Sequence, residues 1–136
     1  MQTTRVIQER LSSGVKVPTE RRQFHRSPRS VKERTAQLFF GQNIGGEHGV
    51  SEADFRKFVD EELTPRFPSG LTVLEGGGQW KGDENKLIRE ASKVVVLVLP
   101  NGIEANLKLN AARKAYKAKF HQESVLLVTQ PACVDF

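Results

Sequence analysis

A run of six apolar residues from Val94 to Leu99 constrains the fold of this chain more than any other segment. Four of the six are Val, a residue that favours strands, and the run is far shorter than the roughly 20 residues of a membrane-spanning helix. A strand with one wet face alternates apolar and polar residues, whereas an unbroken run indicates that both faces are covered. The sequence therefore predicts a strand that is buried on both sides.

Other segments have periodic patterns of their own. Ser51 stands in the N-cap position of a helix, and apolar residues follow at helical spacing until Pro65 stops it. Three consecutive glycines, Gly76 to Gly78, interrupt a strand and suggest a bulge or a close backbone approach. The expected strands are residues 36–41, 71–80, 87–99 and 124–128, and the expected helices are residues 51–64 and 103–121.

The resulting order is β-α-β-β-α-β. Two β-α-β halves joined by a hairpin are typical of the α+β ferredoxin-like sandwich, a four-stranded antiparallel sheet with two helices on one face. Helices cover only one face of such a sheet. We therefore expect the other face to be buried by a second copy in a homodimer, by the N-terminal segment, or by a partner.

Positive charge is concentrated at the N-terminus. Residues 1–34 hold nine Lys/Arg and three Asp/Glu, whereas the other 102 residues hold twelve and thirteen. We expect residues 1–33 to form a basic N-terminal arm, either ordered or disordered when free, and residues 34–136 to form the domain. Arginine pairs with carboxylates or phosphates in bidentate geometry. The residues predicted to bind an acidic partner are Arg21, Arg22, Arg26 and Arg29.

The N-terminus also bears on localisation. Arg21 and Arg22 resemble the core of a twin-arginine export signal, but no apolar stretch follows them. We therefore expect a cytoplasmic protein, with organellar targeting left open. No segment is long and apolar enough to predict a transmembrane helix.

Catalytic and metal-binding patterns are weak. His25, His48, His121 and the single cysteine, Cys133, lack the spacing of metal ligands, and Cys133 has no obvious base. The prediction is no metal, no cofactor and no catalytic residue. RNA binding across the sheet is disfavoured because the strand around Val94 carries no aromatic residue, which leaves nucleic-acid binding to the arm alone.

One set of polar residues falls near strand ends and the central hairpin. Pairing of Glu90 with Lys93, and of Arg66 with Glu90 or Glu123, would make it a structural network. The functional alternative is a small pocket with Trp80 as a wall and Arg66 as an anion clamp. Its members are Arg66, Gln79, Trp80, Glu90, Lys93, Gln122 and Glu123.

From Arg34 onward the chain resembles a bacterial family known only as a domain of unknown function, number three-five-seven-four. The matching residues are Arg34-Thr35, Leu38 to Gly41, Val50-Ser51, Thr64 to Pro68, Gly70 to Thr72, Gly78 to Trp80, Arg89-Glu90, Ser92-Lys93, Tyr116, Phe120, Gln122 to Val125, Cys133 and Phe136. Many members resemble exported proteins with a signal sequence, which the polar N-terminus of this chain lacks. The resemblance implies a domain boundary and no established activity.

The leading expectation from these patterns is a non-enzymatic binding or assembly module whose basic arm docks on the acidic surface of a protein or larger assembly. The first alternative is a small-molecule-binding protein or enzyme of the dimeric α+β-barrel type, with a site between sheet and helices near Trp80 and Glu90. The second alternative is nucleic-acid binding through the arm.

Overall fold

A computed structural model of the chain describes residues 31–136. The arginines assigned to partner binding, Arg21, Arg22, Arg26 and Arg29, lie outside these residues, so that prediction is untested. Four long strands form one antiparallel sheet in the order β4-β5-β1-β6. Their bounds are Val31–Gly41 for β1, Thr72–Lys81 for β4, Leu87–Pro100 for β5 and Leu126–Val134 for β6.

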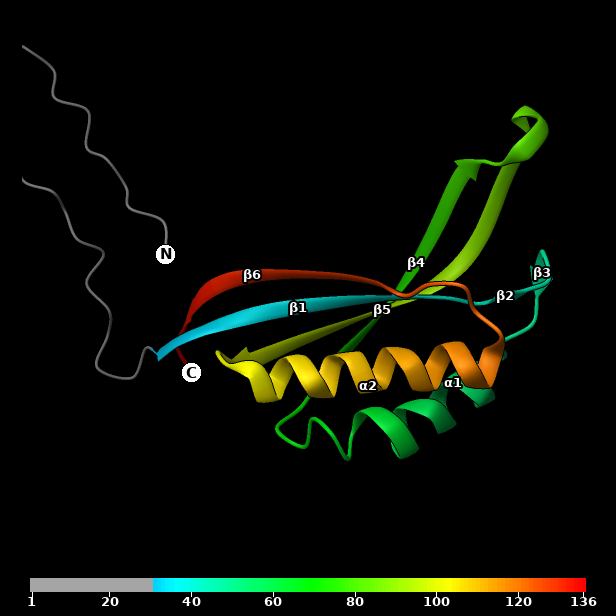
Figure 1. Ribbon diagram of the computed structural model, residues 1–136. Coiled ribbons are helices and arrows are strands. Elements are labelled where there is room, and N and C mark those ends of the chain that lie inside the picture. Colours follow the sequence, from blue (N-terminus) through cyan, green and yellow to red (C-terminus); the bar gives the residue numbers. More distant parts are fainter. Residues whose placement is uncertain (1–30) are drawn as a thin grey trace, which may run out of the picture.

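Helices cover one face of this sheet (Figure 1). Helix α1 (Glu52–Phe58) continues into a π-helical turn, η1 (Val59–Leu63), and helix α2 spans Ile103–Phe120. The backbone N–H of Asp54 donates to Ser51 Oγ at 3.0 Å, which confirms the N-cap predicted for α1. The α+β class and the four-stranded antiparallel sheet with two helices are therefore confirmed.

Element bounds differ most where strand pairing decides them. β1 begins at Val31, five residues before its predicted start, because residues 31–35 pair with β6 at Gln130–Val134. β6 likewise continues through Pro131 to Val134, beyond the expected strand end at residue 128. The segment 42–49, which lies between the strand and the helix expected from the sequence, contains a two-stranded ribbon of β2 (Asn43–Ile44) and β3 (Glu47–His48).

The core lies between the sheet and the helices. Alternate residues of β1 and β5 point into it, including Leu38, Phe40, Val95 and Leu97, each at most 1% exposed. Five aromatic rings form the centre of the core, and their centroids lie 4.6–6.3 Å apart where they pack in pairs. These rings belong to Phe40, Phe55, Phe58, Tyr116 and Phe120.

The opposite face of the sheet, which we call the open face, carries the remaining side chains of the strands. In β5, Val94 and Val96 are half-buried and Val98 is 40% exposed. In β6, Leu126 is 58% exposed. No helix or strand within residues 31–136 packs over these side chains. The apolar run was expected to be buried on both faces, and the described residues bury it only on the face toward the helices.

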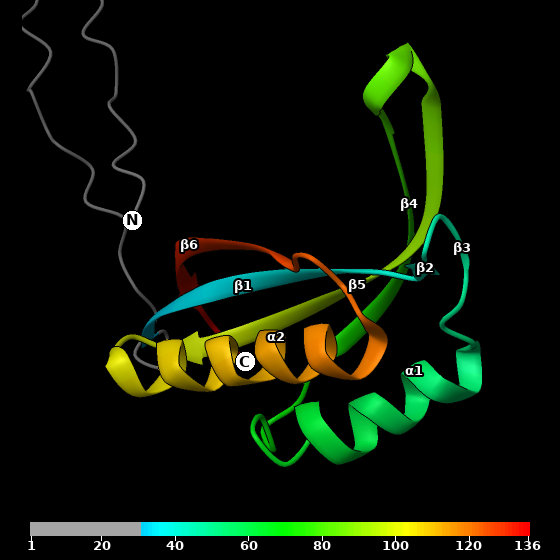
Figure 2. The same cartoon turned by 45° about the vertical axis from the view of Figure 1, so that its right-hand side comes forward.

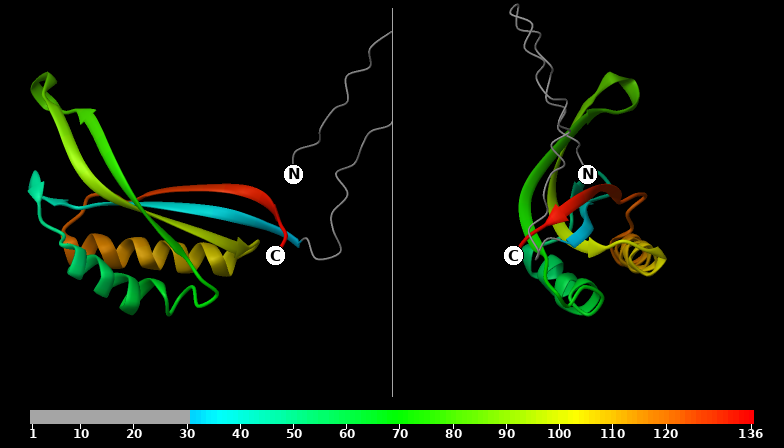
Figure 3. Two further views of the ribbon diagram at one scale, coloured as in Figure 1. Left: turned by 180° about the vertical axis from the view of Figure 1, so that it is seen from behind. Right: turned by 90° about the vertical axis from the view of Figure 1, so that its left-hand side faces the viewer.

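β4 and β5 extend beyond the rest of the sheet. β1 pairs with β5 as far as Ser92, and residues 77–91 beyond this point form a hairpin extension that pairs with itself. Figures 1 and 2 show the extension bending away from the helices, toward the side of the open face. The views in Figure 3 confirm this direction. A turn of 3₁₀ helix, η2 (Asp83–Asn85), closes its tip.

The bulge expected at the three glycines is absent from this hairpin. The register of β4 with β5 is continuous from the Thr72–Val96 pair to the Lys81–Leu87 pair. A bulge would place one extra residue of β4 opposite β5 and would move the following side chains of β4 to the other face. The glycines are paired one to one with Ser92, Ala91 and Glu90, so no such shift occurs. None of the helices in residues 31–136 is long and apolar enough to cross a lipid bilayer.

Candidate functional site

Glycines and two polar side chains form a bare patch on the open face, where the hairpin extension leaves the sheet. Gly41 of β1 and Gly76 of β4 both pair with Ser92 of β5, and Gly78 pairs with Glu90. Alternation of side chains along strands places all five residues on the open face. We call this patch the glycine shelf. Glycines at such a place let another molecule approach the backbone closely.

The carboxylate of Glu90 is the charged group of the shelf. Glu90 is half-buried, and its Oε1 accepts a hydrogen bond of 2.9 Å from the backbone N–H of Asn43. A Cβ atom at Gly41 would lie 2.5 Å from Glu90 Oε1, far inside van der Waals contact. A Cβ at Gly76 would likewise lie 2.8 Å from Ser92 Oγ. Glycine at these two positions therefore makes room for the two polar groups.

Residues from the helical side of the molecule hold the backbone around Glu90. Tyr116 of α2 donates its hydroxyl proton to the carbonyl oxygen of Gly41 at 2.5 Å. Gln122 donates from Nε2 to the carbonyl oxygen of Asn43, also at 2.5 Å. Burial raises the pKa of Tyr116, and the nearby charge of Glu90 raises it further. The tyrosine therefore stays protonated and acts as a donor.

Apolar side chains flank the shelf along the strands. Toward the hairpin tip, Trp80 of β4 pairs with Ile88 of β5 on the same face, and Trp80 is 47% exposed. Toward the middle of the sheet, Leu74, Val94 and Phe39 form the next row. A carboxylate fixed between two apolar borders attracts a ligand that combines a positive charge with an apolar or planar part.

The structure distributes the seven predicted pocket residues over several places. Lys93 is on the helix side of the sheet, because it stands three positions after Glu90 and side chains alternate along the strand. The predicted Glu90–Lys93 pair therefore does not form. Lys93 is 2% exposed and pairs instead with Glu52 of α1, at 2.6 Å, and with Glu75 of β4.

Arg66 is also remote from Glu90. Its Nη1 lies 2.5 Å from Glu62 Oε2, one helical turn earlier, and 2.9 Å from the Glu62 carbonyl oxygen. The predicted contact with Glu90 or Glu123 is therefore replaced by a local one. Gln79 and Glu123 are exposed. Trp80 and Glu90 share the open face, and Gln122 holds the backbone of Asn43, whose N–H binds Glu90, so three of the seven residues lie in or beside the shelf.

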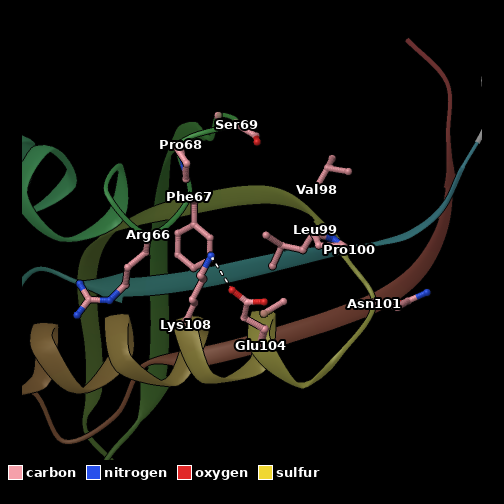
Figure 4. A pocket seen from close by; sticks show the side chains of 12 residues that line it. Arg66, Phe67, Pro68, Ser69, Val98, Leu99, Pro100, Asn101, Glu104 and Lys108 are labelled. Atoms are coloured by element: carbon pink, nitrogen blue, oxygen red, sulfur yellow. Dashed lines mark ion pairs between the residues drawn. The ribbon is translucent and has the colours of Figure 1, made fainter.

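A surface pocket of about 450 Å³ lies at the other end of the sheet (Figure 4). Phe67 and Leu99 contribute apolar walls, and the Arg66 side chain borders it. Glu104 and Lys108, one turn apart on α2, pair with each other at 3.6 Å along the helix side of the pocket. These two charges satisfy one another, so the pocket offers no unpaired charged group from that pair. No cluster of three or more His, Cys, Asp or Glu in residues 31–136 has the geometry of a metal site.

Sequence reasoning missed several residues of the shelf. The sequence predicts only a strand end at Gly41, and it predicts no strand or helix at Asn43. Alternation along β5 could have placed Ser92 beside Glu90 on one face, and would have excluded Lys93 from it. Tyr116 gave no such signal, because its contact with Gly41 joins residues 75 positions apart.

The chain matches the sequence model of a protein family, and its fold is similar to that of solved enzyme structures. Residues 34–136 match the sequence model described as Protein of unknown function (DUF3574). No curated protein matches the chain. A solved phage SAM lyase in complex with S-methyl-5'-thioadenosine is 17% identical, with a TM-score of 0.59, and the match covers 76% of this chain and 90% of that one. The same kind of enzyme in its apo state is 18% identical, with a TM-score of 0.59 and coverages of 77% and 90%.

These matches correct the leading functional expectation. Both solved structures are of an enzyme, and the shared fold spans most of this domain. The prediction of a non-enzymatic module that docks through a basic arm is therefore wrong, and its alternative of a small-molecule-binding protein or enzyme is favoured. The location given for that alternative also changes. Aromatic side chains fill the space between sheet and helices, whereas Trp80 and Glu90 lie on the open face.

Proposed function

This chain belongs to the DUF3574 family of unknown function, and we propose that it is a small-molecule-binding protein or enzyme whose site is the glycine shelf. The observation that carries the proposal is the half-buried carboxylate of Glu90, which the Asn43 N–H fixes at 2.9 Å beside Gly78, where no side chain lies within 4 Å of an added Cβ. A fixed charge beside bare backbone is suited to a small ligand rather than to a broad macromolecular surface.

The chemistry of the shelf narrows the ligand class. Glu90 favours a positive centre, Ser92 offers a hydroxyl, and Trp80 and the open surface at Gly78 accommodate a flat ring. S-adenosylmethionine has both features, because it joins a sulfonium cation to an adenine ring. The solved enzymes of similar fold act on this compound, and one of them holds S-methyl-5'-thioadenosine. We therefore propose an adenosine-containing sulfonium compound as the first ligand to test.

In this proposal Glu90 contributes electrostatic stabilisation of the positive centre. The hydrogen bond from Asn43 fixes one carboxylate oxygen, and Gln122 and Tyr116 fix the backbone that provides this bond. A preorganised charge needs no rearrangement when the ligand binds or reacts. Ser92 is a second polar contact on the same strand.

The test is calorimetric titration of the full chain with S-adenosylmethionine and with the uncharged S-methyl-5'-thioadenosine, followed by chromatography of the incubated S-adenosylmethionine. Glu90→Gln is expected to weaken binding of the charged compound at least about tenfold, and that of the uncharged one much less. Glu33→Gln is the matched control, because Glu33 is a half-buried carboxylate at the far end of the open face. Absence of binding by the wild type, or equal binding by Glu90→Gln, would refute the proposal.

Two finer predictions from the sequence also remain proposals. The β-α-β-β-α-β order of the long elements supports a ferredoxin-like assignment within the confirmed α+β class. The exposed apolar side chains of the open face support a homodimer through that face. Division of the chain at residue 34, nucleic-acid binding by the arm and a cytoplasmic location stay predictions, because they concern residues 1–30 or properties beyond the fold.

A further inference from the structure

The open face carries three rows of side chains without a single ionisable group. Two of the rows run across all four strands and the third across β5, β1 and β6, between the glycine shelf and Glu33. Five members are large apolar residues on the two outer rows, and the exposed fractions of Leu74, Val98 and Leu126 are 49%, 40% and 58%. The rows are Leu74, Val94, Phe39 and Leu126; Thr72, Val96, Gln37 and Val128; and Val98, Thr35 and Gln130.

We propose that a second copy of this chain packs on these three rows and closes the glycine shelf from the side that a single copy leaves open. Charge favours this occupant. Two copies of a face without ionisable groups can pack together without repulsion between like charges. A basic arm or a nucleic acid gains no electrostatic attraction from these rows, because the rows carry no charge of the opposite sign. Self-complementarity of this kind is what an isologous interface requires.

The size of the face indicates that the contact extends onto the hairpin. Four strands about 4.8 Å apart and five residues at about 3.3 Å each give a footprint of about 300 Å². A stable interface buries about 800 Å² on each partner. The sheet rows alone are therefore too small, and the nearest additional surface on the same side is the hairpin extension of residues 77–91 (Figure 2).

The hairpin extension also carries large apolar side chains that no other described element covers. Trp80 and Leu87 are each 47% exposed and point to opposite sides of the hairpin. A two-stranded hairpin without further packing is marginally stable in water. A second copy seated on the three rows would contact the side that carries Trp80, which is also the side of Glu90. The shelf would then have a wall from each copy.

The proposal that the second copy closes the glycine shelf rests on the proposed function. The proposal that the chain forms a dimer does not, so dimer formation and ligand binding are measured separately. The mass of the full chain is measured without ligand by light scattering and sedimentation. The wild type is expected to be a dimer at micromolar concentrations. Leu126→Glu is expected to raise the dissociation constant of the dimer at least about tenfold. Leu107→Glu is the matched control, because Leu107 is 63% exposed on α2, on the other side of the molecule.

Titration with S-adenosylmethionine then tests the closure. A Leu126→Glu monomer with an unchanged melting transition is expected to bind at least about tenfold more weakly, although Glu90 is intact. Equal binding by monomer and dimer would overturn the closure and leave the proposed function standing. A dimer that binds no ligand would support self-association and refute the proposed function. A monomeric wild type overturns the proposal whether or not the variant folds.

Discussion

The ammonium group of Lys93 lies 2.6 Å from the carboxylate of Glu52, and this contact ties the first turn of α1 to the middle of β5. Lys93 is 2% exposed, whereas the side chains of its two partners, Glu52 and Glu75, are 71% and 76% exposed. The cation is thus buried while its counterions are solvated. This asymmetry determines which partner is costly to remove.

Lys93→Met is expected to change the free energy of unfolding by about 1 kcal/mol or less, because a side chain of similar volume replaces the charge and the two glutamates remain solvated. The double substitution of Glu52 and Glu75 by Gln leaves the buried ammonium group of Lys93 without a counterion. We expect this double variant to lose more free energy of unfolding than Lys93→Met. Urea unfolding of both variants measures which of them loses more free energy of unfolding. A greater loss in Lys93→Met would contradict it. Glu104→Gln, in an exposed pair, is the control.

Stability is expected to fall at both ends of the pH range. The hydrogen bond from Lys93 holds the pKa of Glu52 below its ordinary value of 4.5, so its contribution is present above that pH and is lost as the pH falls. Burial alone would lower the pKa of Lys93, but the two carboxylates raise it above 10.5. That contribution is present below pH 10.5 and is lost as the pH rises through the folded pKa.

Tyr116 adds to the alkaline loss. Its pKa in the folded chain is above the ordinary 10.0, so the unfolded chain releases this proton first and stability declines above pH 10.0. Tyr116→Phe is expected to cost about 1 kcal/mol at pH 7, because the carbonyl of Gly41 loses its donor. It should also make the decline above pH 10.0 shallower. Thermal melts across the pH range measure both effects, and an unchanged alkaline slope would argue against this role.

The glycines of β4 and β1 provide a matched pair of substitutions. Gly41→Ala places Cβ 2.5 Å from Glu90 Oε1, so we expect a loss of about 1–3 kcal/mol and displacement of the carboxylate. Gly77→Ala has nothing within 4 Å of the new Cβ and points to the other face. We expect it to be neutral or slightly stabilising, because alanine restricts the unfolded chain. Similar losses in both variants would show that crowding at Glu90 is not the cause.

The same substitutions extend to ligand binding. Gly41→Ala should weaken binding of S-adenosylmethionine, because it moves the group proposed to hold the positive centre. Gly77→Ala should leave binding unchanged. The readout is the dissociation constant at a temperature where both variants are folded. Loss of binding in Gly77→Ala would place the ligand elsewhere on the hairpin.

The elements with a local signal were predictable. The Ser51 cap, the stop at Pro65 and the continuous apolar run at Val94 to Leu99 each placed an element correctly, because their causes lie within a few residues. Bounds that depend on pairing were missed. β1 begins at Val31 because β6 extends to Val134, and no local pattern near Val31 reports a strand 100 residues away.

The sequence alone determined the α+β class, the concentration of positive charge in residues 1–34 and the apolar character of β5. The tertiary structure alone decided which polar groups meet. Strand alternation and register put Glu90 among Gly41, Gly76 and Gly78 on the open face, and put Lys93 with Glu52 on the other face. Local patterns arise from neighbours in the chain, whereas a site is made by side chains that long-range packing brings together. The apolar run was therefore visible from the start, and the carboxylate beside it became a candidate site once the sheet was folded.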